Sequence, residues 1–395
     1  MKKGLVGICG AAAIPGAWKT ALGMPQGKGA APALPGRSLG KTGLAIPLLS
    51  MGTGEVSSTN LIRMGYDAGI KLFFSATYYG QGNNERLVGE ALKGLPRDSF
   101  IVGTAATPEG FNARAGLPPK NLTAASYMKT AEDSMKRFGL DRVDILLLPF
   151  ADKKELVLCE PIMQAMSDLK KQGKIRWTGI ALHNPGGEAL RAAADSKAYD
   201  IAMPAYNFKT KDLDAVNGAI AYAAKAGMGI VAMKTTAGGA SGRAGSQPMN
   251  VGAALKWVLQ NKDVSSIVSG MSSIDELQNN LAMLKDVKLS EQDLKDLNRG
   301  TAQSEDSLYC QQCGTCLSQC PMDLDIPTLM RSYMYAYGYR NAVQARAALD
   351  SVDLPPDPCD TCETCGVACP SGFDVRDRVR DIVRLKNVPK EFLKA

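Results

Sequence analysis

Eight cysteines near the end of the chain repeat one spacing, C-x2-C-x2-C-x3-C-P, and are the residues best suited to chemistry. The two copies are Cys310, Cys313, Cys316 and Cys320 with Pro321, and Cys359, Cys362, Cys365 and Cys369 with Pro370. In this spacing three thiolates of one loop bind a 4Fe-4S cube, and the cysteine before proline binds the other cube. We therefore expect two 4Fe-4S clusters. The predicted ligand sets are Cys310, Cys313, Cys316 and Cys369, and Cys359, Cys362, Cys365 and Cys320.

Structural zinc and disulfide bonds are the alternatives for these cysteines, because four-cysteine zinc sites also use C-x2-C pairs. Neither alternative requires a third cysteine and a trailing proline in both copies. Of ten cysteines in all, only Cys9 and Cys159 lie outside the two copies, so the chain does not have the composition of a disulfide scaffold.

The first 33 residues have the outline of an export leader. Lys2 and Lys3 precede a short apolar stretch, residues 5–18, and a segment of small residues follows. A protein that acquires its clusters before export leaves the cytoplasm folded, which favours the twin-arginine route. No Arg-Arg pair is present, so the true start codon is expected upstream of Met1. The expected location is periplasmic or otherwise extracytoplasmic. A surface arm on a cytoplasmic protein is the alternative, and no apolar run is long enough for a membrane span.

From about Leu48 to Leu284, short apolar runs alternate with amphipathic segments of helical periodicity, such as Asn84–Leu95 and Ala124–Phe138, within a domain expected to span residues 34–300. Eight runs are predicted to be strands: 48–52, 71–76, 100–106, 143–149, 175–182, 201–206, 229–233 and 266–270. Eight β/α units of this length predict a TIM (β/α)8 barrel, whose site lies at the carboxyl ends of the strands. An open doubly wound sheet is the alternative, but no G-x-G-x-x-G opens an early helix.

Several motifs in this region resemble the aldo/keto reductases. They begin with Arg37-Ser38-Leu39-Gly40-Lys41-Thr42-Gly43-Leu44 and Leu49-Ser50-Met51-Gly52-Thr53-Gly54, and continue with Asp67-Ala68-Gly69-Ile70, Tyr79-Gly80, Glu85 to Leu92, Gly173-Lys174-Ile175-Arg176, Tyr206-Asn207 and Val231-Ala232-Met233-Lys234. The resemblance covers roughly residues 36–298. The cysteines that follow resemble the iron–sulfur branch of that family, which implies a barrel joined to a ferredoxin-like domain.

The family reduces carbonyls with hydride from NADPH and supplies a proton from a tyrosine whose pKa is adjusted by Lys, Asp and His. The resemblance places that tyrosine at Tyr79. It places Phe74 where the family has Asp, Ala105 where it has Lys and Pro149 where it has His. Ordinary carbonyl reduction is therefore not expected from this chain.

Other residues at the strand ends are weaker candidates for a site. Asn280 matches the family's adenine-side Asn, but residues 270–275 lack the Lys and Arg with which the family binds the 2'-phosphate of NADPH. His183, the only histidine, ends the fifth predicted strand and is a candidate proton donor or a structural hydrogen-bonding group. Lys234 ends the seventh predicted strand and is the remaining charged candidate for binding a cofactor.

Residues 301–395 are predicted to form the cluster domain, which resembles the α-helical ferredoxins. Residues 326–348 are expected to be one helix, and Val375, Val379, Ile382 and Val383 predict a C-terminal helix. Tyr333, Tyr335, Tyr337 and Tyr339 are predicted to pack over the clusters and the barrel, with electron relay or partner docking as the alternatives. Residues 304–371 contain nine acidic and three basic side chains, although the whole chain carries +7. This asymmetry predicts a basic redox partner, such as a c-type cytochrome or a membrane redox complex, and no nucleic acid.

Two functions follow from these observations. The first is an iron–sulfur electron-transfer protein built on a barrel that has lost aldo/keto reductase chemistry. The second is an oxidoreductase that reduces a small carbonyl-type substrate near Tyr79, His183 and Lys234. It would use electrons from the clusters, with a bound mediator such as a flavin, or from NAD(P)H. The sequence leaves open whether the chain is an enzyme.

Overall fold

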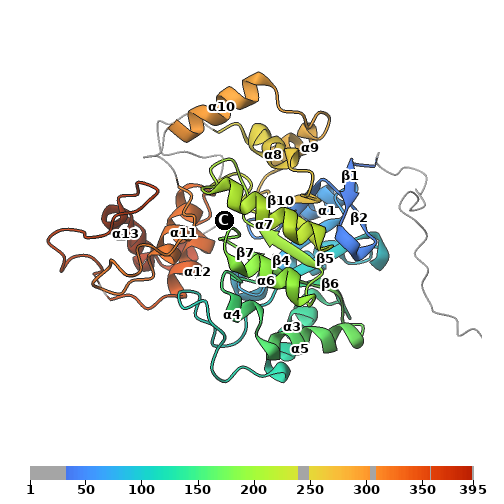
Figure 1. The fold of residues 1–395 in the computed structure, drawn as a ribbon, viewed down its shortest axis with the longest axis horizontal. Coiled ribbons are helices and arrows are strands. Elements are labelled where there is room, and N and C mark those ends of the chain that lie inside the picture. The colour runs from blue at the N-terminus through green and yellow to red at the C-terminus, as the bar shows by residue number, and fades with distance from the viewer. Residues whose placement is uncertain (1–32, 239–248, 303–307, 356, 394–395) are drawn as a thin grey trace, which may run out of the picture. The chain divides into compact units, whose positions relative to one another are not determined.

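The computed structural model describes residues 33–238, 249–302, 308–355 and 357–393, so the expected leader lies almost wholly outside the described residues. Eight parallel strands form a closed barrel (Figure 1). They are β3 (Leu49–Gly52), β4 (Leu72–Ala76), β5 (Ile101–Ala105), β6 (Val143–Leu148), β7 (Ile175–Leu182), β8 (Ile201–Pro204), β9 (Gly229–Ala232) and β10 (Ser266–Gly270). All eight predicted strands are present and end within two residues of their predicted bounds. The closed barrel excludes the open doubly wound sheet.

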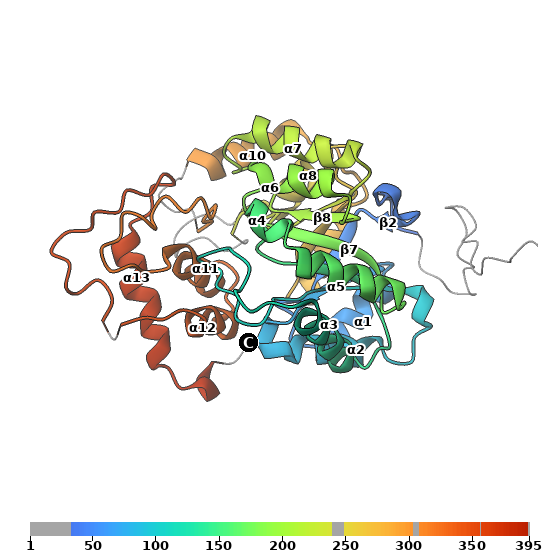
Figure 2. The same ribbon diagram turned by 60° about the horizontal axis from the view of Figure 1, so that its bottom comes forward.

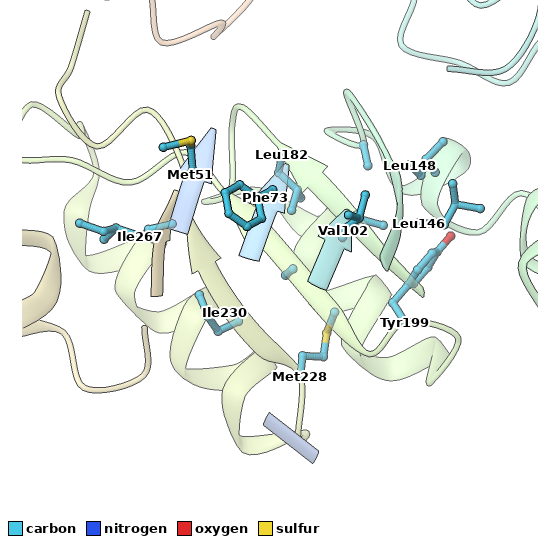
Figure 3. Close-up of a cluster of buried hydrophobic side chains, with 14 of the residues drawn as sticks. Met51, Phe73, Val102, Leu146, Leu148, Leu182, Tyr199, Met228, Ile230 and Ile267 are labelled. Carbon is cyan, nitrogen blue, oxygen red and sulfur yellow. The ribbon is translucent and has the colours of Figure 1, made fainter. Parts of the chain in front are cut away.

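Side chains of the barrel strands alternate between two cores, because successive residues of a strand point to opposite faces. Leu72, Phe74, Ile145 and Leu147 belong to the core inside the barrel. Phe73, Leu146 and Leu148 belong to the outer core between the strands and the surrounding helices, part of which Figure 3 shows. Almost every one of these residues is buried, so the strands read as continuous apolar runs, as is typical of parallel sheets.

In the described residues of the barrel region, ten helices follow the strands. They are α1 (Thr59–Asp67), α2 (Asn83–Leu92), α3 (Ala124–Phe138), α4 (Lys154–Val157), α5 (Glu160–Lys171), α6 (Glu188–Ser196), α7 (Leu213–Lys225), α8 (Val251–Gln260), α9 (Ile274–Met283) and α10 (Glu291–Ala302). Short 3-10 segments η1 (Gly40–Thr42), η2 (Tyr79–Gly82) and η3 (Arg97–Ser99) lie in the connections. Helix α3 has its predicted bounds because Thr123 and Ser126 form a reciprocal capping box and Gly139 ends the helix with φ +65°.

A two-stranded hairpin that sequence reasoning did not predict precedes the barrel. Strands β1 (Gly36–Ser38) and β2 (Ala45–Pro47) are antiparallel. Leu39 and Ile46 of this segment are buried with the interior residues of the barrel. The Arg37 guanidinium donates to the carbonyls of Leu259, Asn261 and Val264. The hairpin thus adds apolar side chains to the barrel's inner core.

The C-terminal region is mainly helical, as predicted, with α11 (Ile326–Tyr337), α12 (Ala342–Asp350) and α13 (Val375–Val383) followed by η5 (Arg384–Asn387) and η6 (Lys390–Phe392). Helix α11 packs against both α12 and α13, as Figure 2 shows. Val375, Val379 and Ile382 are buried on the inner face of α13. No helix in the described ranges is long and apolar enough to cross a membrane.

The prediction of one helix over residues 326–348 is wrong, because the chain breaks between α11 and α12. Arg340 has φ +53°, and the Asn341 side chain caps the new helix by accepting from the backbone N–H of Gln344. At Gly338, a side chain would collide with the backbone carbonyl of Gly238 in the barrel. The break therefore lets the helical region approach the barrel closely.

Candidate functional site

A cavity of about 890 Å³ lies at the carboxyl ends of the barrel strands, and we call it the chamber. Its walls include strand-end residues such as Gly52, Ala76 and Ala105. Tyr335 and Tyr339, from the helical C-terminal region, also line it. The chamber therefore occupies the place where TIM barrels carry their sites, beneath residues of a second region.

Buried polar contacts hold the strand ends that shape this chamber. The Asn84 amide donates to the carbonyl of Thr53 at 2.6 Å, and the Ser75 hydroxyl donates to the Asn84 Oδ1 at 2.6 Å. These contacts join the end of β3 to the end of β4. The Tyr79 ring then packs against Gly54, where an added side-chain carbon would lie 2.9 Å from the ring. Gly54 therefore makes room for the tyrosine.

Tyr79 lines the chamber, but its surroundings do not favour proton donation. Burial raises its pKa well above the usual value, and the neighbouring Tyr78, Tyr335, Glu55 and Tyr339 raise it further. A proton donor at neutral pH needs the opposite shift, which a nearby cation would cause. The neighbours that act on it most strongly are three phenols and a carboxylate, and none of these is a cation.

The three other positions that the resemblance relates to the catalytic residues are apolar in the structure. Phe74 lines the chamber and packs so tightly over Gly103 that a larger residue would not fit there. Ala105 ends β5 and also lines the chamber. Pro149 follows β6 and is buried. None of these side chains can bind or release a proton.

Glu55 and Lys234 are two of the charged residues of the chamber, and sequence reasoning missed Glu55. Burial raises the pKa of Glu55 to about 7, while Lys234 lowers it and Glu276 raises it. The Lys234 ammonium lies 5.0 Å and 5.7 Å from the ring centres of Tyr335 and Tyr339. A carboxyl that exchanges a proton near pH 7, beside a cation, is a group able to act as an acid or a base. Its position directly after the first barrel strand was the available signal.

His183 lies in the chamber wall as a neutral, largely buried imidazole. Burial lowers its pKa well below the usual value, and Lys234 and Arg331 lower it further. Its ring stacks on Phe150 with 5.2 Å between ring centres. Its Nδ1 lies 3.9 Å from Asp152 Oδ2 and is buried without a hydrogen-bond partner. The predicted proton donor would therefore act as a neutral hydrogen-bonding group.

The nucleotide end of the chamber contains carboxylates where a phosphate would need positive charge. Asn280 is buried, and its amide lies 3.3 Å from the Ser269 hydroxyl. The Glu276 carboxylate accepts from both the backbone N–H and the hydroxyl of Ser272, at 2.6 Å and 3.0 Å. The Ser273 side chain caps α9. The Ser272 donors and the backbone N–H of Glu276 are thus already engaged by the protein.

The cysteines lie in two groups, Cys310 with Cys313, Cys316 and Cys369, and Cys359 with Cys320, Cys362 and Cys365. Burial raises the pKa of Cys310 to about 12, and Cys316, Cys313 and Cys369 raise it further because they lie close by. Buried thiols crowded in this way ionise only where a metal supplies compensating charge. The donor set therefore suits an iron–sulfur cluster.

The second group shows the same pattern. Burial raises the pKa of Cys359 to about 11, and Cys320, Cys362 and Cys365 raise it further. Apolar residues, including Ile326 and Val379, surround these cysteines. Within the described ranges no three Cys, His, Asp or Glu side chains converge on a single ion. The C-x2-C-x2-C-x3-C-P spacing of both copies fits a cube, in which each cysteine binds a different iron, better than a structural zinc site.

Polar contacts connect the cysteine loops with the barrel. Arg114 donates to the carbonyl and the carboxylate of Asp323, and Lys211 donates to the carbonyl of Pro370. Tyr309, which precedes Cys310, is buried, hydrogen-bonds Asn207 and lies close enough to Tyr339 to raise its pKa. Tyr309 thus lies between Cys310 of the first cysteine loop and Tyr339 of the chamber wall.

Comparison with known proteins identifies both regions. Residues 51–253, just over half of the chain, match the model of the aldo/keto reductase family, and residues 309–373 match that of a 4Fe-4S dicluster domain. L-galactose dehydrogenase of Arabidopsis thaliana is 25% identical over 294 residues, which cover 64% of this chain and 88% of that protein.

Solved structures have the same fold. An aldo-keto reductase from Bacillus halodurans has a TM-score of 0.56 and 20% identity, covering 67% of this chain and 96% of its own. An aldo-keto reductase from Klebsiella pneumoniae, solved in complex with NADPH, has a TM-score of 0.53 and 22% identity, covering 67% and 94%. The chain belongs to the aldo/keto reductase family and combines that oxidoreductase barrel with a C-terminal 4Fe-4S dicluster domain.

Proposed function

We propose that this protein is an iron–sulfur electron-transfer protein whose aldo/keto reductase barrel no longer performs nicotinamide-dependent carbonyl reduction. Cys310, Cys313, Cys316 and Cys369 would hold one 4Fe-4S cluster, and Cys359, Cys362, Cys365 and Cys320 the other. Bound clusters supply one-electron transfer. The cysteines would hold them, and apolar residues such as Ile326 and Val379 would cover part of the second cluster.

The observation that carries this proposal is the environment of Tyr79. Its pKa is raised by burial, and the neighbouring positions hold Phe74 and Ala105 in place of a carboxylate and an amine. Proton transfer from such a phenol to a nascent alkoxide is unfavourable at neutral pH. We infer that the catalytic tetrad of the family is lost.

The charges around the nucleotide end support the same proposal. Glu276 accepts the Ser272 donors, and Lys256 pairs with Asp293 at 3.1 Å. Near Ser272 and Lys256, an incoming 2'-phosphate would meet the Glu276 carboxylate and a lysine that already pairs with Asp293, although Lys234 and Arg340 also line the chamber. NADPH binding is therefore not part of the proposed function.

The proposed location is the periplasm or another extracytoplasmic space, reached through a leader in residues 1–33, with a cytoplasmic location as the alternative. The acidic composition around the cysteines supports docking to a basic redox partner, such as a c-type cytochrome, or to a membrane redox complex. Near the second group, Asp360, Glu363 and Cys365 are exposed.

A second function is favoured by the chamber itself. Glu55 can exchange a proton near pH 7, Lys234 can stabilise an oxyanion, and the first cysteine loop lies one residue away. These groups suit reduction of a small carbonyl-type substrate with electrons from the clusters. In this alternative Glu55 replaces Tyr79 as the proton donor.

Anaerobic purification with iron counting, followed by titration with NADPH and then with a low-potential one-electron donor, separates these functions. The proposal expects about eight irons, no bleaching of the cluster absorbance by NADPH and fast bleaching by the low-potential donor. Bleaching by NADPH would show a working nicotinamide site, and few irons would contradict both functions. Substrate-dependent reoxidation of the reduced protein would identify the second function.

A further inference from the structure

A second cavity, of about 900 Å³, lies between the barrel and the cysteine domain, and we call it the side cavity. The barrel contributes Thr107, Phe111 and Arg114 from the segment between β5 and α3. The cysteine domain contributes Asp323, Arg331 and Gln344, among others. The volume is within the range of cofactor pockets.

The side cavity and the chamber share one wall. Tyr78, Phe150, Tyr335 and Gln344 line both of them. Phe150 has φ +55°, a conformation that is rare for a bulky residue and that clusters at functional sites. A ligand in the side cavity would therefore lie one layer of side chains from the chamber.

Aromatic rings make the apolar part of the side cavity. Phe111 and Phe150 are nearly parallel, with 6.0 Å between ring centres, and Tyr78 lies 5.5 Å from Phe150. The Arg331 guanidinium lies 5.1 Å from the centre of the Phe150 ring. Flat rings of this kind favour a planar conjugated ligand.

Two buried polar atoms of the side cavity lack hydrogen-bond partners. They are the Thr107 hydroxyl oxygen and the Gln344 Oε1, one on each side of the domain junction. Buried polar atoms without partners are rare, and each calls for an explanation. Gln344 Oε1 accepts only, so the ligand that satisfies it must present an N–H or O–H donor.

The charges that line the side cavity favour a neutral ligand. Arg114 is paired with Asp323, and Arg331 donates to Gln312 and Thr328. Asp325 and Asp353 add further acidic groups to the lining. The lining therefore carries three carboxylates, Asp323, Asp325 and Asp353, against the two cations Arg114 and Arg331, so a phosphate would meet more negative than positive charge, whereas an uncharged ring would not.

The side cavity also adjoins the second cysteine group. Met322, Asp323 and Leu324 line it, and they directly follow Cys320 and Pro321. The cavity therefore lies between that cysteine loop and the chamber wall.

We propose that the side cavity binds a neutral isoalloxazine ring, stacked on its aromatic residues, with ring N–H and carbonyl groups bonded to Gln344 and Thr107. A quinone has the same planar shape, but its oxidised form offers Gln344 no donor. The ring's use as an electron carrier between cysteine domain and chamber rests on the proposed function. The binding of the ring to the side cavity is independent of that function.

Equilibrium dialysis of oxidised, iron-replete protein in the dark tests this proposal with three probes: lumiflavin, flavin mononucleotide and menadione. Lumiflavin should be retained most tightly. Flavin mononucleotide should bind about tenfold more weakly because its phosphate meets the acidic lining, and menadione more weakly because it lacks the N–H. Gln344→Ala and Thr107→Val should each weaken lumiflavin binding about tenfold. Gln292→Ala, on an exposed position of α10, should not change it.

Iron content measured on each sample shows whether a variant has kept its fold and clusters. No retention of lumiflavin by iron-replete protein would overturn the proposal and leave the electron-transfer function untouched. Menadione binding as tight as lumiflavin binding would overturn it in favour of a quinone site. If Gln344→Ala and Thr107→Val bound lumiflavin as tightly as the unchanged protein, the ring would have to bind elsewhere and the proposal would be wrong. Few irons with normal lumiflavin binding would instead contradict the electron-transfer function.

Discussion

At the barrel mouth, Phe74 and Ala105 stand where the aldo/keto reductase resemblance places an acid and an amine, whereas the cysteine domain keeps two groups of four thiols. Both regions are well packed, so packing alone does not distinguish them. The two regions differ in the surroundings of their buried ionisable groups. Burial and neighbouring phenols disfavour ionisation of Tyr79, while Cys310, Cys316 and Cys359 are each surrounded by other thiols of their group, as a metal centre requires.

The two cysteine groups also differ from each other. Arg376 donates to the carbonyls of Cys362 and Glu363 at 2.5 Å and 2.8 Å, and it lowers the pKa of Cys359. In the first group, Asp325 contributes to raising the pKa of Cys316. Arg376 would stabilise the reduced form of the second cluster, and Asp325 would destabilise the reduced form of the first. An electron shared between them would therefore favour the second cluster.

The largest expected effect comes from cysteine substitutions, which test whether the last cysteine of each loop binds the cluster of the other loop. Cys369→Ser should remove one cluster, about half of the iron. Cys313→Ser with Cys369→Ser should remove no more than either single change, because both residues serve the same cube. Cys365→Ser with Cys369→Ser should remove both clusters. Iron analysis and electron paramagnetic resonance measure this, with Cys159→Ser as the control that keeps all the iron.

In the barrel, Glu55 is expected to make the stability of the protein depend on pH. Its carboxyl keeps a proton up to about pH 7 in the folded protein but only to about 4.5 when unfolded. The stability it contributes is therefore full below pH 4.5 and is lost as the pH rises to 7, by up to about 3 kcal/mol. Glu55→Gln should remove this dependence.

Denaturant unfolding at several pH values between 4 and 8 measures that effect. Lys234 and Glu276 are the charged groups that act on Glu55, and Tyr79 and Tyr339 lie close to it. The exposed Glu188→Gln change on α6 should leave the pH dependence as it is. An unchanged slope in Glu55→Gln would show that Glu55 titrates normally.

Arg376→Gln should lower the reduction potential of the second cluster by tens of millivolts and leave the first unchanged. Removing a nearby cation destabilises the reduced, more negative cluster, and a tenfold change in a one-electron equilibrium is about 59 mV. A potentiometric titration followed by electron paramagnetic resonance resolves the two potentials. Arg380→Gln is the matched control on the same helix, since Arg380 is exposed and pairs with Asp360. Equal shifts in both variants would mean that only the overall charge matters.

The smallest expected effect is that of Tyr79→Phe. If Tyr79 no longer donates protons, this change leaves the rate of cluster reduction and any carbonyl reduction within experimental error. Stopped-flow measurement with NADPH and with a low-potential donor checks both rates. A clear loss of NADPH-dependent activity would mean that the barrel still uses its tyrosine.

Much of the fold was predictable, because each barrel strand is an apolar run whose neighbours break it with glycine or polar residues. The hairpin of β1 and β2 escaped prediction, since three-residue strands carry too short a pattern. The break between α11 and α12 escaped it as well. A single glycine such as Gly338 does not by itself predict the end of a helix. The reason for the break is the close approach of Gly338 to the backbone of Gly238, which the sequence does not show.

The candidate site was predictable only in part. His183, Lys234 and Tyr79 were expected at the mouth and do line the chamber, because parallel strands bring their carboxyl ends together. Glu55, Phe150 and Gln344 carry no motif. Their importance comes from burial, backbone conformation and missing partners, which depend on residues far away in the sequence.

The sequence by itself determined the barrel, the helical cysteine domain and the two cysteine patterns, because periodicity and ligand spacing are local properties of the chain. Tertiary structure decided how these parts act on one another. It placed Tyr335 and Tyr339 over the barrel mouth, raised the pKa of Glu55 and opened a side cavity at the domain junction. The physical reason is that desolvation and charge interactions depend on which distant side chains exclude water from a group.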